Sequence, residues 1–295
     1  MRYAAHETLV APARPSAQLW RLCLGLGMTV ACFFAMGYTY FNLLAELVTQ
    51  SEWPLFASEI DNGTTPRGMF VLLGIFGLLT LSLMLVVNLL HRRQMRTLLG
   101  PPGKAALDFL RVSVALSALA TLLWLLPEPT IMAPDPGLPK LRWLALLPLA
   151  LPLVFLQISA EELAFRGYLQ SQLAARFSHP VVWLALPAVI FALLHYDPAT
   201  AGANAPVYVL SAFVFGLAAA DLTARSGTLG PALALHFTNN IGALLITAPQ
   251  GQSFGLALYI YPFALDDIPA RATWLPYDLM VLLCAWLAAR LAITR

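Results

Sequence analysis

The feature that most constrains this chain is a series of eight apolar segments along its length. A bilayer core about 30 Å thick takes roughly 20 apolar helical residues to cross. Backbone polar groups in lipid must find their partners within the protein, which leaves helices as the simplest solution for such segments. We therefore predict an all-α, polytopic membrane helix bundle of about eight transmembrane helices, forming one transmembrane domain over residues 1–295. The segments lie at 22–46, 69–90, 105–126, 143–160, 181–195, 206–223, 229–248 and 274–293.

Composition excludes several other classes of protein. The chain is 59% hydrophobic and 11% charged, where a soluble domain carries about 25% charged residues. The net charge of +2 and the lack of a basic run with interleaved aromatics argue against a nucleic-acid partner. The three cysteines fall inside apolar segments with no metal-ligand spacing. The bilayer itself is therefore the expected surrounding of most of the chain.

Orientation can be predicted from the loops, because Lys and Arg stay on the cytoplasmic side. With eight spans, most of the 17 basic residues fall on the side of the two termini. The apolar stretch near the N-terminus is too long for a signal peptide, and we interpret it as a retained first span. We expect an integral, multi-pass protein with cytoplasmic N- and C-termini. The Pro-rich segment 127–140 and the aromatic segment 250–273 are then loops on the other side.

A charged run, Glu161-Glu162-Leu163-Ala164-Phe165-Arg166, follows the fourth apolar segment. Ionisable groups at membrane depth are costly and usually functional. On a helix, Glu162 and Arg166 lie one turn apart and can pair, while Glu161 is rotated by about 100° and remains available. This run predicts one structural carboxylate and one free carboxylate near the cytoplasmic face.

Two later segments add polar side chains. Phe191 and His195 are four residues apart at the end of the fifth segment, and His236 and Asn240 are four apart in the seventh. Each set alone has a structural explanation: an interfacial ion pair, a hydrogen-bonded histidine, or polar contacts between helices. Together they favour a common site, because a chain buries carboxylate, imidazole and carboxamide in a membrane only where they satisfy one another.

The combination suits hydrolysis. A carboxylate in apolar surroundings is a better base for water, and imidazole and carboxamide groups can donate to a developing oxyanion. One glutamate and two histidines could equally bind zinc, although no HExxH motif is present. Residues alone leave these alternatives open, with Glu161, His195 and His236 as the ligands of a zinc site. Serine and aspartyl intramembrane proteases fit poorly, since no suitably placed serine and no GxGD occur.

The motifs EExxxR, FxxxH and HxxxN, in this order on separate helices, resemble the CPBP family, which includes type II CAAX prenyl endopeptidases and bacteriocin-processing proteins. The approach to His236, Ser226-Gly227-Thr228-Leu229-Gly230-Pro231, is also similar, and the resemblance covers a core at about 155–245. It implies an eight-helix glutamate-dependent intramembrane protease with a site that opens toward the cytosol and without a metal cofactor.

By this resemblance, Glu161 activates water, His195 helps to position it, and His236 and Asn240 stabilise the oxyanion. Glu162, Arg166 and Phe191 are supporting residues. The substrate would be a membrane-bound or lipidated peptide or protein, and the location a bacterial inner membrane. The alternative function is a non-catalytic membrane binding, transport or immunity-type protein that uses the same buried cluster. The polar residues crowd into one half of the chain without an inverted repeat, which argues against a transporter.

Overall fold

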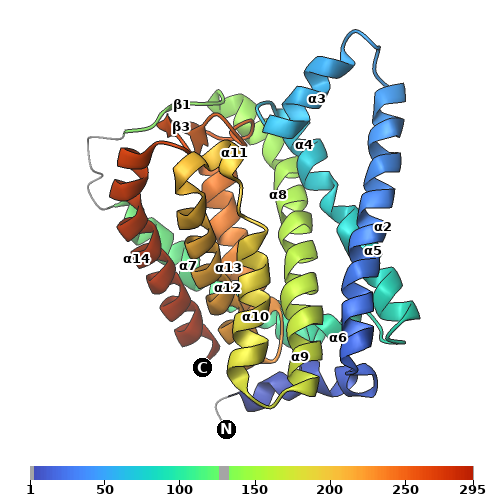
Figure 1. Ribbon diagram of the computed structural model, residues 1–295. Coiled ribbons are helices and arrows are strands. Elements are labelled where there is room, and N and C mark those ends of the chain that lie inside the picture. Colours follow the sequence, from blue (N-terminus) through green and yellow to red (C-terminus); the bar gives the residue numbers. More distant parts are fainter. Residues whose placement is uncertain (1–2, 126–132, 295) are drawn as a thin grey trace.

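The computed structural model describes residues 3–125 and 133–294 and shows a bundle of helices with a small sheet at one end (Figure 1). Both termini lie at the opposite end of the bundle (Figure 1). Residues 126–132, which include the first part of the predicted Pro-rich loop, lie outside the described residues. The elements in chain order are η1 Ala4–His6, α1 Glu7–Val10, η2 Ala11–Ser16, α2 Leu19–Glu46, α3 Trp53–Asn62, α4 Pro66–Gly74, α5 Phe76–Leu89, α6 Arg96–Leu99, α7 Pro102–Trp124, β1 Asp135–Pro136, α8 Lys140–Glu162, η4 Leu163–Gln170, α9 Ser171–Arg176, α10 Pro180–Leu193, α11 Pro198–Ala201, η5 Gly202–Asn204, α12 Ala205–Ser226, α13 Gly230–Asn240, η6 Ile241–Ile246, β2 Thr247–Gln250, β3 Tyr259–Ala264 and α14 Ile268–Ile293.

The predicted polytopic helix bundle is confirmed, although two of the eight predicted spans are shorter than a full membrane-crossing α-helix. Within the described residues, six helical stretches are long and apolar enough to cross a membrane. The fifth predicted span is the shorter apolar helix α10, and the seventh is α13 continued by the π-helix η6. Large apolar side chains on the outside of the bundle remain exposed, including Phe34, Leu122 and Leu291. This is the surface that a helix bundle presents to lipid.

The fourth predicted span is much longer than its apolar sequence. Helix runs without a break from Lys140 through η4 to Arg176, and α8 continues through Pro148 and Pro152. Glu161 therefore lies about 20 Å from the end of this helical run at 1.5 Å per residue. The predicted fourth segment ended at residue 160, but the helix continues past Glu161 because a buried run that includes Arg166, Gln170 and Gln172 extends it beyond the apolar stretch.

Two close approaches between helices set the position of the core. A Cβ on Gly216 of α12 would lie 3.0 Å from the Ala188 Cβ of α10, and one on Gly230 of α13 would lie 2.1 Å from the Ala105 carbonyl oxygen of α7. Small residues at such crossings let helix backbones pack closely in a membrane. Helices α7, α10, α12 and α13 consequently surround one apolar core that includes Phe191.

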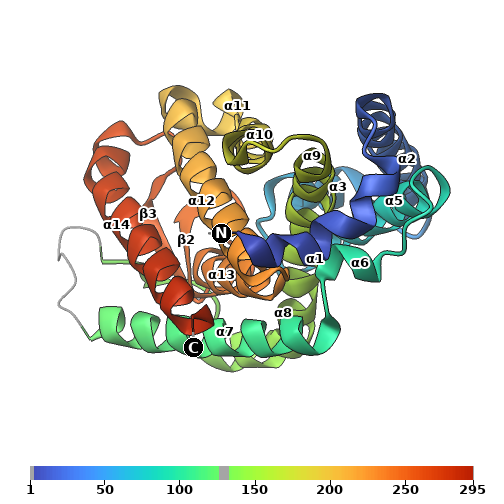
Figure 2. The ribbon, with the colours of Figure 1, turned by 90° about the horizontal axis from the view of Figure 1, so that it is seen from below.

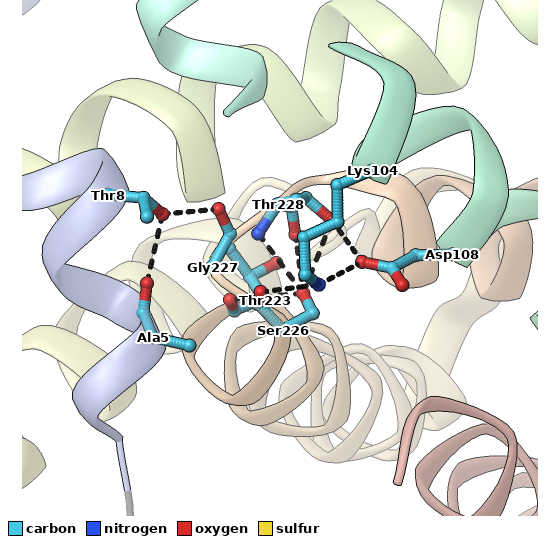
Figure 3. Close-up of polar contacts among 8 residues, drawn as sticks. All are labelled: Ala5, Thr8, Lys104, Asp108, Thr223, Ser226, Gly227 and Thr228. Carbon is cyan, nitrogen blue, oxygen red and sulfur yellow. Dashed lines mark hydrogen bonds and ion pairs between the residues drawn. The ribbon is translucent and has the colours of Figure 1, made fainter. Parts of the chain in front are cut away.

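A polar cluster at the end of the bundle that carries the termini fixes the turn between α12 and α13 (Figure 3). The buried carboxylate of Asp108 accepts hydrogen bonds from Lys104 Nζ at 2.6 Å and from Thr228 Oγ1 at 2.9 Å. Thr8 from the N-terminal segment donates to the Gly227 carbonyl at 2.6 Å. Gly227 has φ of +69°, a left-handed conformation that ends α12 and favours glycine. These contacts fix the turn that precedes α13, the helix that carries His236.

The sheet at the other end was not predicted. It has the strand order β1-β3-β2, with β3 antiparallel to β1 and parallel to β2. Strands β2 and β3 belong to the segments interpreted as the end of a span and an aromatic loop. Figure 2, viewed from below, shows α7 and α14 on the outside of the helix bundle. Helices α2 and α5 lie together at one side of it.

Candidate active site

Both helices that carry the acidic and amide motifs change from α to π immediately after the motif residues. Helix α8 ends at Glu162 and is followed by η4, and α13 ends at Asn240 and is followed by η6. The wider turn of a π-helix is rare and frequently found at functional sites. The change from α to π therefore marks the two positions where the motif residues lie.

Glu162 is the structural carboxylate of the pair. Its Oε1 accepts from Arg166 Nη1 at 2.9 Å and lies 2.8 Å from His236 Nδ1, and the side chains of Glu162 and Arg166 are 0% and 1% exposed. The Arg166 guanidinium also lies 4.6 Å from the ring centroid of Phe191. A buried carboxylate in a low-dielectric interior needs such partners to remain charged. Phe191 thus packs against the ion pair, as the supporting role would require.

Glu161 points into a cavity instead. Its side chain is 14% exposed, and its Oε2 lies 3.6 Å from His236 Nε2. Its Oε1 accepts a 2.8 Å hydrogen bond from Gln157 Nε2. Gln157 in turn accepts from Asn240 Nδ2 at 2.8 Å, which links the first and third motifs through one side chain. The sequence reading missed Gln157, although a glutamine one turn before Glu161 in an apolar span was a signal that could have found it.

His236 lies between the two carboxylates. Glu162 is paired with Arg166, and a carboxylate can only accept, so the 2.8 Å contact assigns a proton to His236 Nδ1. His236 Nε2 then faces Glu161. The edge of the His236 ring also packs on Phe215, with centroids 4.8 Å apart. The imidazole is therefore fixed in tautomer and in orientation, as acid–base groups in enzymes usually are.

His195 is placed on the wall of the same cavity, but the structure does not bond it to the other motif residues. Its Nδ1 lies 2.9 Å from the Phe191 carbonyl oxygen. A carbonyl can only accept, so Nδ1 carries the proton and Nε2 of the neutral ring is free to accept. Among the described residues, no hydrogen bond or ion pair joins His195 to Glu161 or His236. A molecule in the cavity is needed to connect them.

The cavity has a volume of about 740 Å³. Its floor carries Gln157, Glu161 and Asn240, and its walls come from α7, α12 and α14. It extends past Ser211 and Arg271 to Thr247 on β2 and Tyr261 on β3, at the end of the bundle away from both termini (Figure 1). Sequence reasoning expected cytoplasmic termini, and the family resemblance implied a site open to the cytosol. The structure tests neither expectation, and both stay predictions.

The zinc alternative receives no support from the arrangement of ligands. In the part of the chain that the structure describes, no three His, Cys, Asp or Glu side chains are grouped so that they could hold a metal ion. Glu161 and His236 are close, but the bond from His195 Nδ1 to the Phe191 carbonyl leaves only its Nε2 for any ligand role. Recruitment of a metal would require His195 to approach the other two residues.

The fold and the site define a multi-pass membrane protein with a carboxylate and an imidazole on the floor of an internal cavity. Residues 142–242 match the family model described as Type II CAAX prenyl endopeptidase Rce1-like. This part of the chain, about a third of the 295 residues, is similar to the CAAX protease family, which confirms the resemblance drawn from the three motifs. No curated protein and no solved structure matched the chain. The matched residues contain all three motifs, while α2 to α7 and α14 lie outside them.

Proposed function

We propose that the protein is an intramembrane endopeptidase in which Glu161 activates a water molecule to hydrolyse a peptide bond. The observation that carries this proposal is the different state of the two adjacent carboxylates. Glu162 is fully buried and engaged by Arg166 and His236, whereas Glu161 reaches the cavity and faces His236 Nε2 at 3.6 Å. One carboxylate thus orients the imidazole, and the other is available as a base.

The reaction would proceed in two steps. Glu161 takes a proton from water while the water oxygen attacks the carbonyl carbon, and the carbonyl electron pair moves to oxygen to form a tetrahedral oxyanion. The proton then passes from Glu161 to the amide nitrogen, the carbon–nitrogen bond breaks, and the carbonyl re-forms as a carboxylic acid. The two products are a new C-terminus and a free amine, and Glu161 returns to its ionised form.

The neighbouring groups would hold the reactants in place. Neutral His195 offers Nε2 as an acceptor for the attacking water. Asn240 donates one amide N–H to Gln157, and its second amide N–H would donate to the oxyanion. His236 Nε2 lies beside Glu161 and would donate to the same oxyanion once it has taken up a proton. Preorganised donors of this kind act where charge develops, and each is worth about 10²–10³ in rate.

We propose a membrane-associated or lipidated peptide or protein as the substrate. The cavity of about 740 Å³ is large enough for several extended residues, and its walls on α7, α12 and α14 are largely apolar. Because Glu161 lies within the bundle, a soluble folded protein could not reach it, whereas an extended membrane-bound segment could. A zinc-dependent mechanism, with Glu161, His195 and His236 as ligands, is the alternative that the same experiment separates.

The test is cleavage of a panel of membrane peptides by the purified protein in detergent, scored by mass spectrometry. Glu161→Gln and Glu161→Ala should each lower the rate by about 10²–10⁴-fold, while Glu46→Gln, at an exposed glutamate far along α2, should cleave as the wild type does. Activity that survives a chelator supports the metal-free mechanism. Loss on chelation with rescue by zinc would transfer Glu161, His195 and His236 to metal ligation, and equal cleavage by wild type and Glu161→Ala would refute the assignment.

A further inference from the structure

A second cavity lies at the end of the bundle that carries the termini, far from the site described above. Its volume is about 470 Å³, and it is formed by η2, the start of α2 and the end of α5. Its lining includes Pro12, Trp20, Arg21, His91 and Arg92. The reaction proposed for Glu161 makes no use of this cavity.

The two arginines of this cavity lack a carboxylate partner. Among the described residues, no ion pair includes Arg21 or Arg92, and the Arg21 guanidinium lies 5.3 Å from the ring centroid of its neighbour Trp20. Other basic residues nearby are neutralised or engaged. Arg14 forms an ion pair with Glu7.

Arg93 shows the contrast most clearly, since it follows Arg92 directly. Its guanidinium donates to Thr97 Oγ1 at 2.8 Å, Ser171 Oγ at 2.8 Å and the Leu9 carbonyl at 2.9 Å, and it is buried. Arg93 therefore holds the structure together, while Arg92 remains exposed at the cavity. Arg92 and Arg93 are adjacent in the sequence, but only Arg93 forms the buried hydrogen bonds that join neighbouring segments.

His91 contributes shape and polarity to the cavity without contributing charge. Its ring nitrogens lie 3.0 Å from Ser16 Oγ and 2.8 Å from the Tyr168 hydroxyl. Burial, with smaller effects of Arg93 and Arg21, lowers the pKa of His91 to about 4. The ring is therefore neutral near pH 7, and the positive charge of the cavity comes from Arg21 and Arg92.

The cavity lies where a membrane surface is expected. Helix α2 begins at Leu19 and α5 ends at Leu89, and both belong to helical stretches long and apolar enough to span a bilayer. Trp20 is 59% exposed, and Leu24 and Leu89 on the membrane side of the cavity are also exposed. Exposed tryptophan is typical of the headgroup region, and exposed leucine next to it provides contact for acyl chains.

We propose that this cavity binds the headgroup of an anionic phospholipid, with the phosphate between Arg21 and Arg92 and the acyl chains along the exposed leucines of α2 and α5. Basic pockets between membrane helices are suited to such headgroups. A free phosphate shares the headgroup chemistry, but it would leave the apolar rim of the cavity unused. The lipid therefore accounts for both the charge and the leucines.

The experiment is a native mass spectrometry titration of the full-length protein in a neutral detergent. Phosphatidylglycerol, phosphatidylcholine and inorganic phosphate are the three probes. Each arginine near a membrane surface contributes about 1 kcal/mol toward an anionic lipid, so Arg21→Gln with Arg92→Gln should weaken phosphatidylglycerol binding about thirtyfold. Arg176→Gln, at an exposed arginine on the same side but outside the cavity, should leave the binding unchanged.

The outcomes separate the possible ligands. Preference of the wild type for phosphatidylglycerol, lost in the double variant, supports the proposal. Equal binding of the two lipids by the wild type, or equal affinity of the double variant and the wild type for phosphatidylglycerol, would overturn it. Binding of inorganic phosphate with the affinity of the lipid would reassign the cavity to a free anion. Because none of these measurements uses cleavage, their result does not depend on the proposed endopeptidase activity.

Discussion

The half of the bundle near the termini and the half near the sheet use polar side chains in opposite ways. Near the termini, apart from Arg21 and Arg92 at the second cavity, polar groups bond to one another between the helices: Asp108 with Lys104 and Thr228, and Arg93 with three partners. Toward the sheet, the helices enclose a cavity, and Glu161 faces it from the floor. Glu161, Glu162 and His236 lie at the boundary between the two halves.

This difference shows how a membrane protein can hold a charged site without solvent on all sides. Polar groups that are fully satisfied fix the helices and make one structure more stable than its alternatives. Groups that are left partly unsatisfied next to a cavity remain available to water and substrate. In this protein, Glu162 is fully buried with its Oε1 engaged by Arg166 and His236, whereas Glu161 faces the cavity, although the two residues are adjacent in the chain.

The largest effect should come from breaking the buried ion pair at the boundary. Glu162→Gln leaves Arg166 buried without a carboxylate, and we expect it to lower the free energy of unfolding by about 3–5 kcal/mol and to abolish cleavage. Removal of both charges, as in Glu162→Gln with Arg166→Met, should recover part of the stability but none of the activity, since His236 still lacks its anionic partner. Thermal unfolding and peptide cleavage measure the two effects, and a double variant as unstable as Glu162→Gln would contradict this explanation.

Gln157 should affect function more than stability. Gln157→Leu removes the link between Glu161 and Asn240, and loss of alignment of that kind can cost about 10²-fold in rate. We expect kcat to fall while KM and the melting temperature stay near their wild-type values. The conservative variant Gln157→Asn should restore part of kcat. A change in KM alone would show that Gln157 contacts the substrate instead of positioning the base.

Asp108 should show the reverse behaviour. Asp108→Asn weakens its bonds to Lys104 and Thr228, and we expect a loss of about 1–3 kcal/mol in the free energy of unfolding. Cleavage per folded molecule should remain close to that of the wild type, because the cavity is unchanged. Lys104→Met serves as a companion variant that removes the charge on the other side of the same contact. A large loss of kcat in fully folded Asp108→Asn protein would show that the two halves are not separable.

The smallest expected effect is a dependence of stability on pH in the half near the termini. Burial lowers the pKa of His6 to about 4, against about 6.5 in the unfolded chain. The unfolded state therefore takes up a proton first, so the stability from neutral His6 is fully present above pH 6.5 and is lost as the pH falls toward 4. Melting temperatures between pH 4 and 7.5 should fall less for His6→Gln than for the wild type. Parallel curves for the two proteins would contradict this role of His6.

The sequence predicted the helices and the motif residues well for a physical reason. Apolar length and the four-residue spacing of Glu162 and Arg166 are local properties, and the structure keeps both. The separate states of Glu161 and Glu162 followed from helical rotation alone. The catalytic roles themselves remain predictions until cleavage is measured.

What the sequence could not predict depends on contacts between distant segments. The pairing of β3 with β1 joins residues about 120 positions apart, and neither strand carries a strong alternating pattern. The N-terminal segment 4–16 gave no signal of its docking under the bundle, where Thr8 reaches Gly227. The end of the bundle toward which the cavity extends depends likewise on how α7, α12 and α14 pack around Glu161. Residue spacing along one helix carries no information about that packing.

The most direct test of the division into two halves is to measure from which side of the membrane a water-soluble reagent reaches each half. In a variant whose three native cysteines are replaced by alanine, Asn239→Cys places a thiol on the cavity wall next to Asn240, and Gln18→Cys places one beside the start of α2. A membrane-impermeant maleimide, applied to intact cells and to inverted vesicles, should modify these two positions from opposite sides. Modification of both from the same side would contradict the prediction that Glu161 is reached from the end of the bundle away from the termini.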